Sequence, residues 1–306
     1  FKLSAMKIIF MGTPGFSIPS LTAINESKHE LVCVVTVPDK KKGRGQSMSY
    51  SDVKKYAIEK NIEVLQPEDL SDFNFINRLR ALKPDLIIVV AFRILPEIIF
   101  DIPAYGIFNL HASLLPKYRG AAPINRALIN GETETGVTTF FLKKKVDTGN
   151  IILQDKINIL PEDDAGSLHD RLSKLGADAV MKTIELIENK SFTLMYQDDS
   201  SATKAPKIFK EDCKINWSND SAKIHNQIRG LSPYPAAFTH YNNKSIKIFK
   251  SNLTDLKSDS QPGEFLITGK KLYVNTKDNL LEISELQPEG KKRMSAKDFI
   301  NGLNLK

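Results

Sequence analysis

The sequence has few cysteines and no long hydrophobic run. Its two cysteines, Cys33 and Cys213, lie far apart among core-like residues, so we expect two reduced thiols and no disulfide framework. No apolar stretch reaches the roughly 18 residues that a membrane-spanning helix needs. The first residues also lack the basic, apolar and small-residue order of a secretory signal. We therefore expect a cytoplasmic protein with no membrane partner.

Basic residues outnumber acidic residues in the last third of the chain, whereas the first 200 residues balance. The net charge is +7, and residues 1–200 contain as many acidic as basic side chains, so the whole excess lies in residues 201–306. Such asymmetry favours a polyanionic partner for the basic part, although a solvated surface rich in lysine would give the same composition.

The chain also lacks a dinucleotide fingerprint. MGTPGF at residues 11–16 follows the first strand pattern but does not have the G-x-G-x-x-G spacing. Short β-branched runs at residues 7–11, 31–37 and 86–90 alternate with amphipathic stretches, which predicts a doubly wound, Rossmann-like, mostly parallel α/β sheet. Residues 167–188 are expected to form a long helix capped by Ser167.

Composition changes after Asn189, and residues 198–206 are polar, with serines and a proline, as in a linker. Short period-two runs separated by turn residues follow, which are typical of a small OB-like β-barrel. We therefore place a first domain at residues 6–190, a linker at 191–206 and a β-barrel domain at 207–306. Residues 1–5 precede the strand pattern and are expected to be a tag or an extension.

Three polar residues form the main candidate for a catalytic site. Asn109 and His111 share one face of an expected strand because alternate side chains point the same way. The ends of parallel strands are where open α/β sheets place their sites. Asp147 follows in the turn sequence Asp-Thr-Gly. An amide, an imidazole and a carboxylate are the groups of a general acid/base site, although Asn109 and His111 alone could be a structural pair near a turn.

Several motifs around these residues resemble the folate-dependent formyltransferase superfamily. They are SLLP at residues 113–116, RGAAP at 119–123, ETGVT at 134–138 and DTG at 147–149. MGTPGF, TVPDKKKGRG at 36–45, TKAPKI at 203–208 and RGLSPYPAA at 229–237 are similar to the methionyl-tRNA formyltransferases within it. The similarity runs from Met6 to about Leu303.

The resemblance implies transfer of a formyl group from 10-formyltetrahydrofolate to the α-amino group of initiator methionyl-tRNA by a monomeric bacterial enzyme. Asn109 would donate a hydrogen bond to the tetrahedral oxyanion, and His111 would help to stabilise it and move protons. Asp147 would orient His111 or relay a proton through water. No metal is implied, and no zinc-ligand spacing occurs.

The folate is expected to lie along two segments of the chain. The expected folate-binding residues are Val89, Val90, Ala91, Phe92, Ile94, Leu95, Pro96, Ser113, Leu114, Leu115 and Pro116. Phe92-Arg93 stands where this family often has Tyr-Gly. Arg93 is expected either to face solvent or to contact the folate tail.

A basic loop follows the second expected strand. Lys40, Lys41, Lys42 and Arg44 lie there among glycines, as in a mobile surface connection or an arm that contacts nucleic acid. The resemblance favours contact with the tRNA acceptor stem, with Arg44 as the leading candidate.

Other acceptors and roles are alternatives. An amino-sugar-nucleotide N-formyltransferase would share the catalytic residues, but the basic loop and the charged last third argue against it. A glycinamide ribonucleotide formyltransferase would leave the second domain unexplained. An inactive tRNA-binding scaffold would not need Asn109, His111 and Asp147 together.

A charge reversal tests the basic loop. Arg44→Glu should weaken tRNA binding at low salt, and the loss should shrink as salt rises because screening weakens phosphate contacts. Filter binding or fluorescence anisotropy across a salt series measures this. An unchanged affinity at low salt would reject the role of the loop.

Overall fold

The structure, a computed structural model, describes residues 5–42, 47–143 and 146–303. Arg44 lies outside the described residues, and only the backbone of Lys41 and Lys42 is described. By packing, the chain divides into a first unit of residues 1–120, 136–157 and 170–204 and a second unit of residues 121–135, 158–169 and 205–306.

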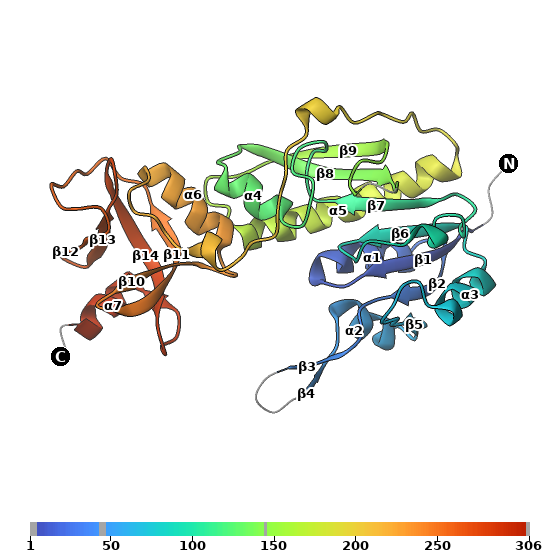
Figure 1. Ribbon diagram of the computed structural model, residues 1–306, viewed down its shortest axis with the longest axis horizontal. Coiled ribbons are helices and arrows are strands. Elements are labelled where there is room, and N and C mark those ends of the chain that lie inside the picture. The colour runs from blue at the N-terminus through green and yellow to red at the C-terminus, as the bar shows by residue number, and fades with distance from the viewer. Residues whose placement is uncertain (1–4, 43–46, 144–145, 304–306) are drawn as a thin grey trace. The chain divides into compact units, whose positions relative to one another are not determined.

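A seven-stranded sheet forms the centre of the first unit, in the order β5-β2-β1-β6-β7-β8-β9 (Figure 1). Its strands are β1 (Lys7–Gly12), β2 (Glu30–Val35), β5 (Val64–Leu65), β6 (Leu86–Val90), β7 (Ile107–His111), β8 (Glu134–Phe141) and β9 (Ile151–Asn158). The pairings from β5 to β7 are parallel, whereas β7 and β8 are antiparallel.

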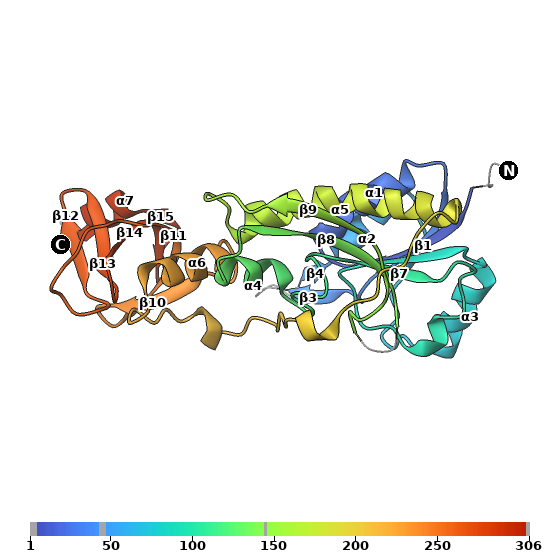
Figure 2. The same ribbon diagram turned by 90° about the horizontal axis from the view of Figure 1, so that it is seen from above.

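Helices cover both faces of this sheet. They are α1 (Ile18–Asn25), α2 (Asp52–Glu59), α3 (Phe73–Leu82) and α5 (Ala165–Glu188). Figure 2 shows α1 and α5 along one face and α3 on the other. All five residues of β6 are buried, as expected for a parallel strand covered on both sides.

Local chemistry sets the helix ends. Asp72 accepts a hydrogen bond from the backbone N–H of Phe75 and begins α3, which ends at Lys83 in a left-handed conformation. The long helix begins two residues before its predicted start at residue 167. Asp164 and Ser167 cap each other, because Asp164 accepts from Ser167 N and Ser167 Oγ accepts from Asp164 N, so α5 begins at Ala165.

The second unit is built on an antiparallel sheet of order β10-β11-β14-β13-β12, with β15 paired to β14. Its strands are β10 (Ala237–Tyr241), β11 (Lys244–Asn252), β12 (Phe265–Thr268), β13 (Lys271–Asn275), β14 (Leu280–Pro288) and β15 (Met294–Ser295). Its helices are α4 (Pro123–Ile129), α6 (Ser221–Leu231) and α7 (Ala296–Leu303).

Aliphatic residues of the sheet, α6 and α7 form one core, together with Trp217. The indole N–H of buried Trp217 donates to the hydroxyl of Thr239 at 2.9 Å, so its polar atom is satisfied inside this core. The predicted fold class is thus confirmed: a doubly wound, mostly parallel sheet followed by a smaller antiparallel β domain. None of the helices in the described ranges is long and apolar enough to cross a membrane.

Short 3-10 helices lie at Gly15–Ser17, Glu97–Ile99, Asp199–Ser201 and Glu211–Cys213. Segments 121–135 and 158–169 pack with the second unit, although the sequence-based boundary places them in the first domain. The predicted division into a first domain at residues 6–190, a linker at 191–206 and a β-barrel domain at 207–306 stays a prediction.

A glycine in β8 allows β9 to approach closely. A Cβ on Gly136 would lie 2.2 Å from the carbonyl oxygen of Asp155 and 2.6 Å from a methyl group of Leu114. Gly136→Ala should therefore lower the free energy of unfolding by about 1–3 kcal/mol. Chemical denaturation measures the change, with Gly302→Ala in α7 as control. Nothing lies within 4 Å of the Cβ position there, and alanine favours helix, so an equal loss in both variants would contradict the clash.

Candidate active site

The candidate site lies where the strand order of the sheet reverses. The chain passes from β1 to β2 on one side and returns to β6 on the other side of β1, so the carboxyl ends of β1 and β6 flank a topological switch point. Open α/β sheets bind ligands in the crevice beside such a point. β7 is the next strand, and its carboxyl end carries His111.

Strand alternation places two of the predicted residues together. Asn109 pairs with Val89 of β6 and Phe140 of β8, and His111 lies two residues further along the same face of β7. Leu110 points to the opposite face, where a Cβ on Gly176 of α5 would lie 2.7 Å from it. Packing of α5 on that face therefore fixes β7, and the side chains of Asn109 and His111 lie on the opposite face of the strand.

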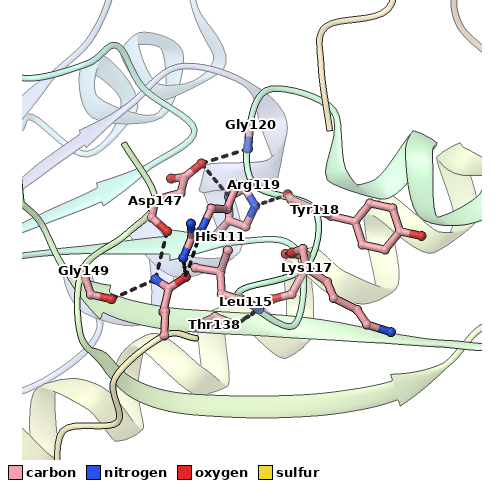
Figure 3. A network of polar contacts seen from close by, with 11 residues as sticks. His111, Leu115, Lys117, Tyr118, Arg119, Gly120, Thr138, Asp147 and Gly149 are labelled. Carbon is pink, nitrogen blue, oxygen red and sulfur yellow. Dashed lines mark hydrogen bonds and ion pairs between the residues drawn. The ribbon is translucent and has the colours of Figure 1, made fainter. Parts of the chain in front are cut away.

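The hydrogen bond of His111 determines which ring nitrogen can react. Nε2 lies 2.8 Å from the carbonyl oxygen of Tyr118 (Figure 3). A carbonyl can only accept a hydrogen bond, so Nε2 carries a proton in both the neutral and the charged imidazole. Nδ1 is then the nitrogen that gains and loses a proton, and it faces Asp147.

Asp147 lies on a turn that holds its carboxylate toward the imidazole. Its backbone φ is +55°, and Oδ2 accepts a hydrogen bond from the N–H of Gly120 at 2.9 Å. The same oxygen is 4.0 Å from His111 Nδ1, too far for a direct hydrogen bond. A water molecule or a substrate amine that lies between these two atoms could bond to both. The structure therefore brings Asn109, His111 and Asp147 to one edge of the sheet.

Side chains of β8 and β9 hold the SLLP loop by hydrogen bonds to its backbone. The hydroxyl of Thr138 donates to the carbonyl of Ser113 at 2.6 Å and accepts from the N–H of Leu115 at 3.1 Å. Gln154 donates to the same hydroxyl and to the carbonyl of Leu115. Ser113 and Leu115 are buried, and Leu114 and Pro116 are half-buried. This part of the predicted folate-binding set is thus a firmly held loop.

The other predicted folate segment begins in the sheet and leaves it abruptly. Val89 and Val90 end β6, and Ala91 follows with φ +50°. Ala91 and Ile94 are exposed, whereas Leu95 packs into the core beneath α3. The remaining two members, Phe92 and Pro96, are half-buried. The segment therefore presents backbone and a few apolar side chains beside the switch point.

Arg93 is half-buried, and its guanidinium is held by two backbone carbonyls. Its guanidinium donates to the carbonyl oxygens of Pro67 at 2.7 Å and Glu68 at 2.9 Å, and it stacks on Phe92. Whether Arg93 also faces solvent or contacts the folate tail, the two uses expected from the sequence, stays a prediction. The side chain ties the loop after β6 to the segment that precedes α3.

The basic loop forms a small hairpin. β3 (Lys40–Lys42) pairs antiparallel with β4 (Ser47–Ser49). At its base, Asp39 accepts hydrogen bonds from Lys54 and Gln66, which lower the pKa of its carboxyl group. Lys40 is exposed. The acid of this loop is thus paired with Lys54 and Gln66 at the base of the hairpin.

The two thiols are poor nucleophiles. Burial raises the pKa of Cys33 to about 12, and burial likewise raises the pKa of Cys213. A reactive cysteine needs a lowered pKa, so neither thiol suits covalent catalysis. Among the described residues, no group of three or more histidines, cysteines or carboxylates is placed to hold a metal ion.

Sequence reasoning missed the residues that hold the site together. Gln197 donates to the carbonyls of Asp147 and Gly149, and Thr203 Oγ1 accepts from Tyr118 N. Both lie in the segment expected to be a linker. Thr203 begins the TKAPKI motif, but Gln197 lies 50 residues from Asp147 and no local pattern marks it.

The chain matches known protein families over most of its length. Residues 6–184 match the family described as Formyl transferase, and residues 207–304 match the one described as Formyl transferase, C-terminal domain. A protein of Flavobacterium johnsoniae named Methionyl-tRNA formyltransferase is 46% identical over 98% of this chain and 97% of its own length. One of the same name from Alkaliphilus oremlandii is 47% identical over 97% and 96%.

Solved structures show the same fold. The sugar 3N-formyl transferase WlaRD, crystallised with dTDP and 5-N-formyl-THF, aligns with a TM-score of 0.68 and 25% identity over 94% of this chain and 99% of its own. The Methionyl-tRNA formyltransferase of Clostridium thermocellum aligns with a TM-score of 0.56 over 82% and 95%, at 18% identity. The family matches cover both units and include the residues around Asn109, His111 and Asp147, so the chain belongs to the formyl transferase family.

Proposed function

We propose that this protein transfers the formyl group of 10-formyltetrahydrofolate to the α-amino group of initiator methionyl-tRNA and so gives N-formylmethionyl-tRNA for translation initiation. The observation that carries the proposal is the near-full-length identity of 46–47% to proteins named Methionyl-tRNA formyltransferase. The geometry agrees with it, because an amide donor, an imidazole and a carboxylate meet at the switch point of the sheet.

The imidazole has a defined part in this reaction. The amine attacks the formyl carbon, and the bond from that carbon to N10 of the folate breaks as the tetrahedral intermediate collapses. His111 Nδ1 accepts the proton that the amine loses, because Nε2 already donates to Tyr118. The same proton can then pass to N10 of the departing tetrahydrofolate, so the catalyst returns to its starting state.

Asn109 and Asp147 stabilise the charges that develop. The amide of Asn109 donates a hydrogen bond to the oxyanion, and one such donor contributes about 3–4 kcal/mol to the transition state. The Asp147 carboxylate, 4.0 Å from Nδ1, stabilises the imidazolium and can accept from the incoming amine. No metal or covalent intermediate enters this scheme.

The co-substrate would lie along the segments after β6 and around SLLP. Backbone groups after the sharp turn at Ala91 can pair with the polar edge of the pterin. The loop at residues 113–116 would border the formyl group, since Thr138 and Gln154 hold it beside His111. A folate donor is supported by a structural relative that was crystallised with 5-N-formyl-THF.

The tRNA would be bound by the basic hairpin and by the domain at residues 207–306. The whole net charge of +7 lies in residues 201–306, which suits phosphate contacts. In the hairpin, Lys40, Lys41, Lys42 and Arg44 are proposed to contact the acceptor stem. We further propose a monomer in the cytoplasm, with the formyl-transfer chemistry within residues 6–190.

One alternative has structural support. WlaRD, a sugar 3N-formyl transferase, shares the fold across 94% of this chain. An amino-sugar nucleotide would present the same primary amine to the same residues. The location of the basic excess favours tRNA, because a small sugar nucleotide does not need a basic domain.

Acceptor choice separates these two functions. Purified protein supplied with 10-formyltetrahydrofolate should formylate initiator methionyl-tRNA and leave a dTDP-amino sugar unmodified. Acid-gel analysis of the aminoacyl-tRNA and mass spectrometry of the sugar nucleotide follow the two products. Formylation of the sugar nucleotide alone would overturn the proposal.

Substitutions at the site test the roles of the acid and base. His111→Ala and Asp147→Asn should each lower kcat by about 10²- to 10⁴-fold, because the proton acceptor or the charge that stabilises it is lost. Asp178→Asn, an exposed carboxylate on α5, is the matched control and should keep full activity. Near wild-type kcat in the Asp147 variant would exclude its charge from the mechanism.

A further inference from the structure

Residues 195–203 are hydrogen-bonded to both loops of the candidate site. Met195 exchanges two backbone hydrogen bonds with Ile151, next to the Asp-Thr-Gly turn. At the other end, the backbone N–H groups of Tyr118 and Arg119 donate to the hydroxyl and the carbonyl of Thr203. We call residues 195–203 the strap. The strap is therefore fixed at both ends to segments that hold His111 and Asp147.

Gln197 of the strap holds the turn on which Asp147 lies. Its Nε2 donates to the carbonyl oxygen of Asp147 at 2.9 Å and to that of Gly149 at 2.8 Å. These carbonyls lie on either side of Thr148. One amide group thus fixes two points of a turn whose first residue has a positive φ.

Arg119 fixes the orientation of this amide. Its Nε and Nη2 atoms donate to Gln197 Oε1 at 3.0 and 2.8 Å, and its Nη1 atom pairs with Asp199 at 2.8 Å. Arginine can only donate, so Oε1 must face it and Nε2 must face the turn. Both amide hydrogens and both acceptor positions of Gln197 are then used.

We propose that Gln197, oriented by Arg119, is a positioning residue for formyl transfer. It holds the backbone of the Asp147 turn so that the carboxylate faces His111 Nδ1. The inference rests on the proposed function, since it assigns Gln197 a part in that same reaction. Gln197 touches no reacting atom and acts only through Asp147.

The contacts that hold the Asp147 carboxylate and the His111 ring do not involve Gln197 directly. The carboxylate itself is anchored by the N–H of Gly120, which is the neighbour of Arg119. Arg119 follows Tyr118, whose carbonyl fixes the imidazole. Loss of the Gln197 amide would therefore free the turn while the His111 side stays in place. A displacement of about 1 Å between catalytic groups can cost about 10²-fold in rate.

The first experiment removes the hydrogen bonds but keeps the shape. Gln197→Met has a similar length and cannot donate to the two carbonyls. We expect kcat for methionyl-tRNA formylation to fall by about 10- to 100-fold, with the KM values for tRNA and 10-formyltetrahydrofolate changing less than about threefold. This split follows because substrate binding does not require the Asp147 turn to be in place.

Gln227 supplies a matched control. Its Nε2 also donates to two backbone carbonyls, those of Asp212 at 2.9 Å and Lys214 at 3.2 Å, within the second unit. Both glutamines are half-buried. Gln227→Met should lower the thermal midpoint about as much as Gln197→Met does, while kcat stays at the wild-type value.

A second variant keeps the contact with Arg119. Gln197→Glu can still accept from the guanidinium, but at neutral pH it presents an anionic oxygen to the carbonyls of Asp147 and Gly149. Its kcat should be lowered at neutral pH, and the ratio of its kcat to that of wild type should rise as pH falls, because a protonated carboxyl can donate one hydrogen bond. A contact that contributes only to folding would leave this ratio flat.

The outcomes separate the two proposals. Folded Gln197→Met with wild-type kcat would overturn the positioning role. If that variant does not fold, an unchanged kcat in Gln197→Glu would overturn it instead. Wild-type protein that fails to formylate methionyl-tRNA would overturn the proposed function, whatever the Gln197 variants do.

Discussion

The hydrogen bond from His111 Nε2 to the carbonyl oxygen of Tyr118 is the constraint on which the site depends. It leaves Nδ1 as the only ring nitrogen that can exchange a proton. Without this bond, either ring nitrogen could carry the proton, and Asp147 would not always face the nitrogen that accepts one. A backbone carbonyl suits this purpose because it has no proton to give and no pKa in the working range. The geometry of β7 brings the imidazole to the sheet edge, and this bond defines what it can do there.

A short loop therefore holds both the imidazole and the carboxylate of the site. Tyr118 fixes the imidazole through its carbonyl, and Gly120 fixes the Asp147 carboxylate through its N–H. Arg119, between them, turns its side chain to the strap and so reaches the other side of the Asp147 turn through Gln197. The imidazole and the carboxylate, 4.0 Å apart, thus share this loop as one of their supports.

The parts of this structure that sequence reasoning could predict are those with a local period. Alternation along β7 placed Asn109 and His111 on one face, and the uniformly apolar run of β6 indicated a strand buried on both sides. Contacts between a side chain and a distant backbone leave no such pattern. Arg93 bonds to carbonyls 25 and 26 residues away, and Gln197 to one 50 residues away, so both roles became visible only in three dimensions. The start of α5 also differs from its predicted position, because Asp164 and Ser167 cap each other.

Acceptor choice has a different physical origin from the chemistry. WlaRD, a sugar formyltransferase, shares the fold of this chain, so a formyl-transfer fold does not by itself distinguish a sugar amine from an aminoacyl-tRNA. The distribution of charge can make that distinction. Several cations of the second unit are neutralised locally, as Lys271 is by Glu282 and Lys277 by Asp220. The basic excess of residues 201–306 remains after such pairing, and it acts over about a Debye length, roughly 8–10 Å at physiological salt. A field of that range attracts a phosphate backbone but gives little preference to a single sugar nucleotide, so selection of the acceptor can be complete before the amine reaches His111.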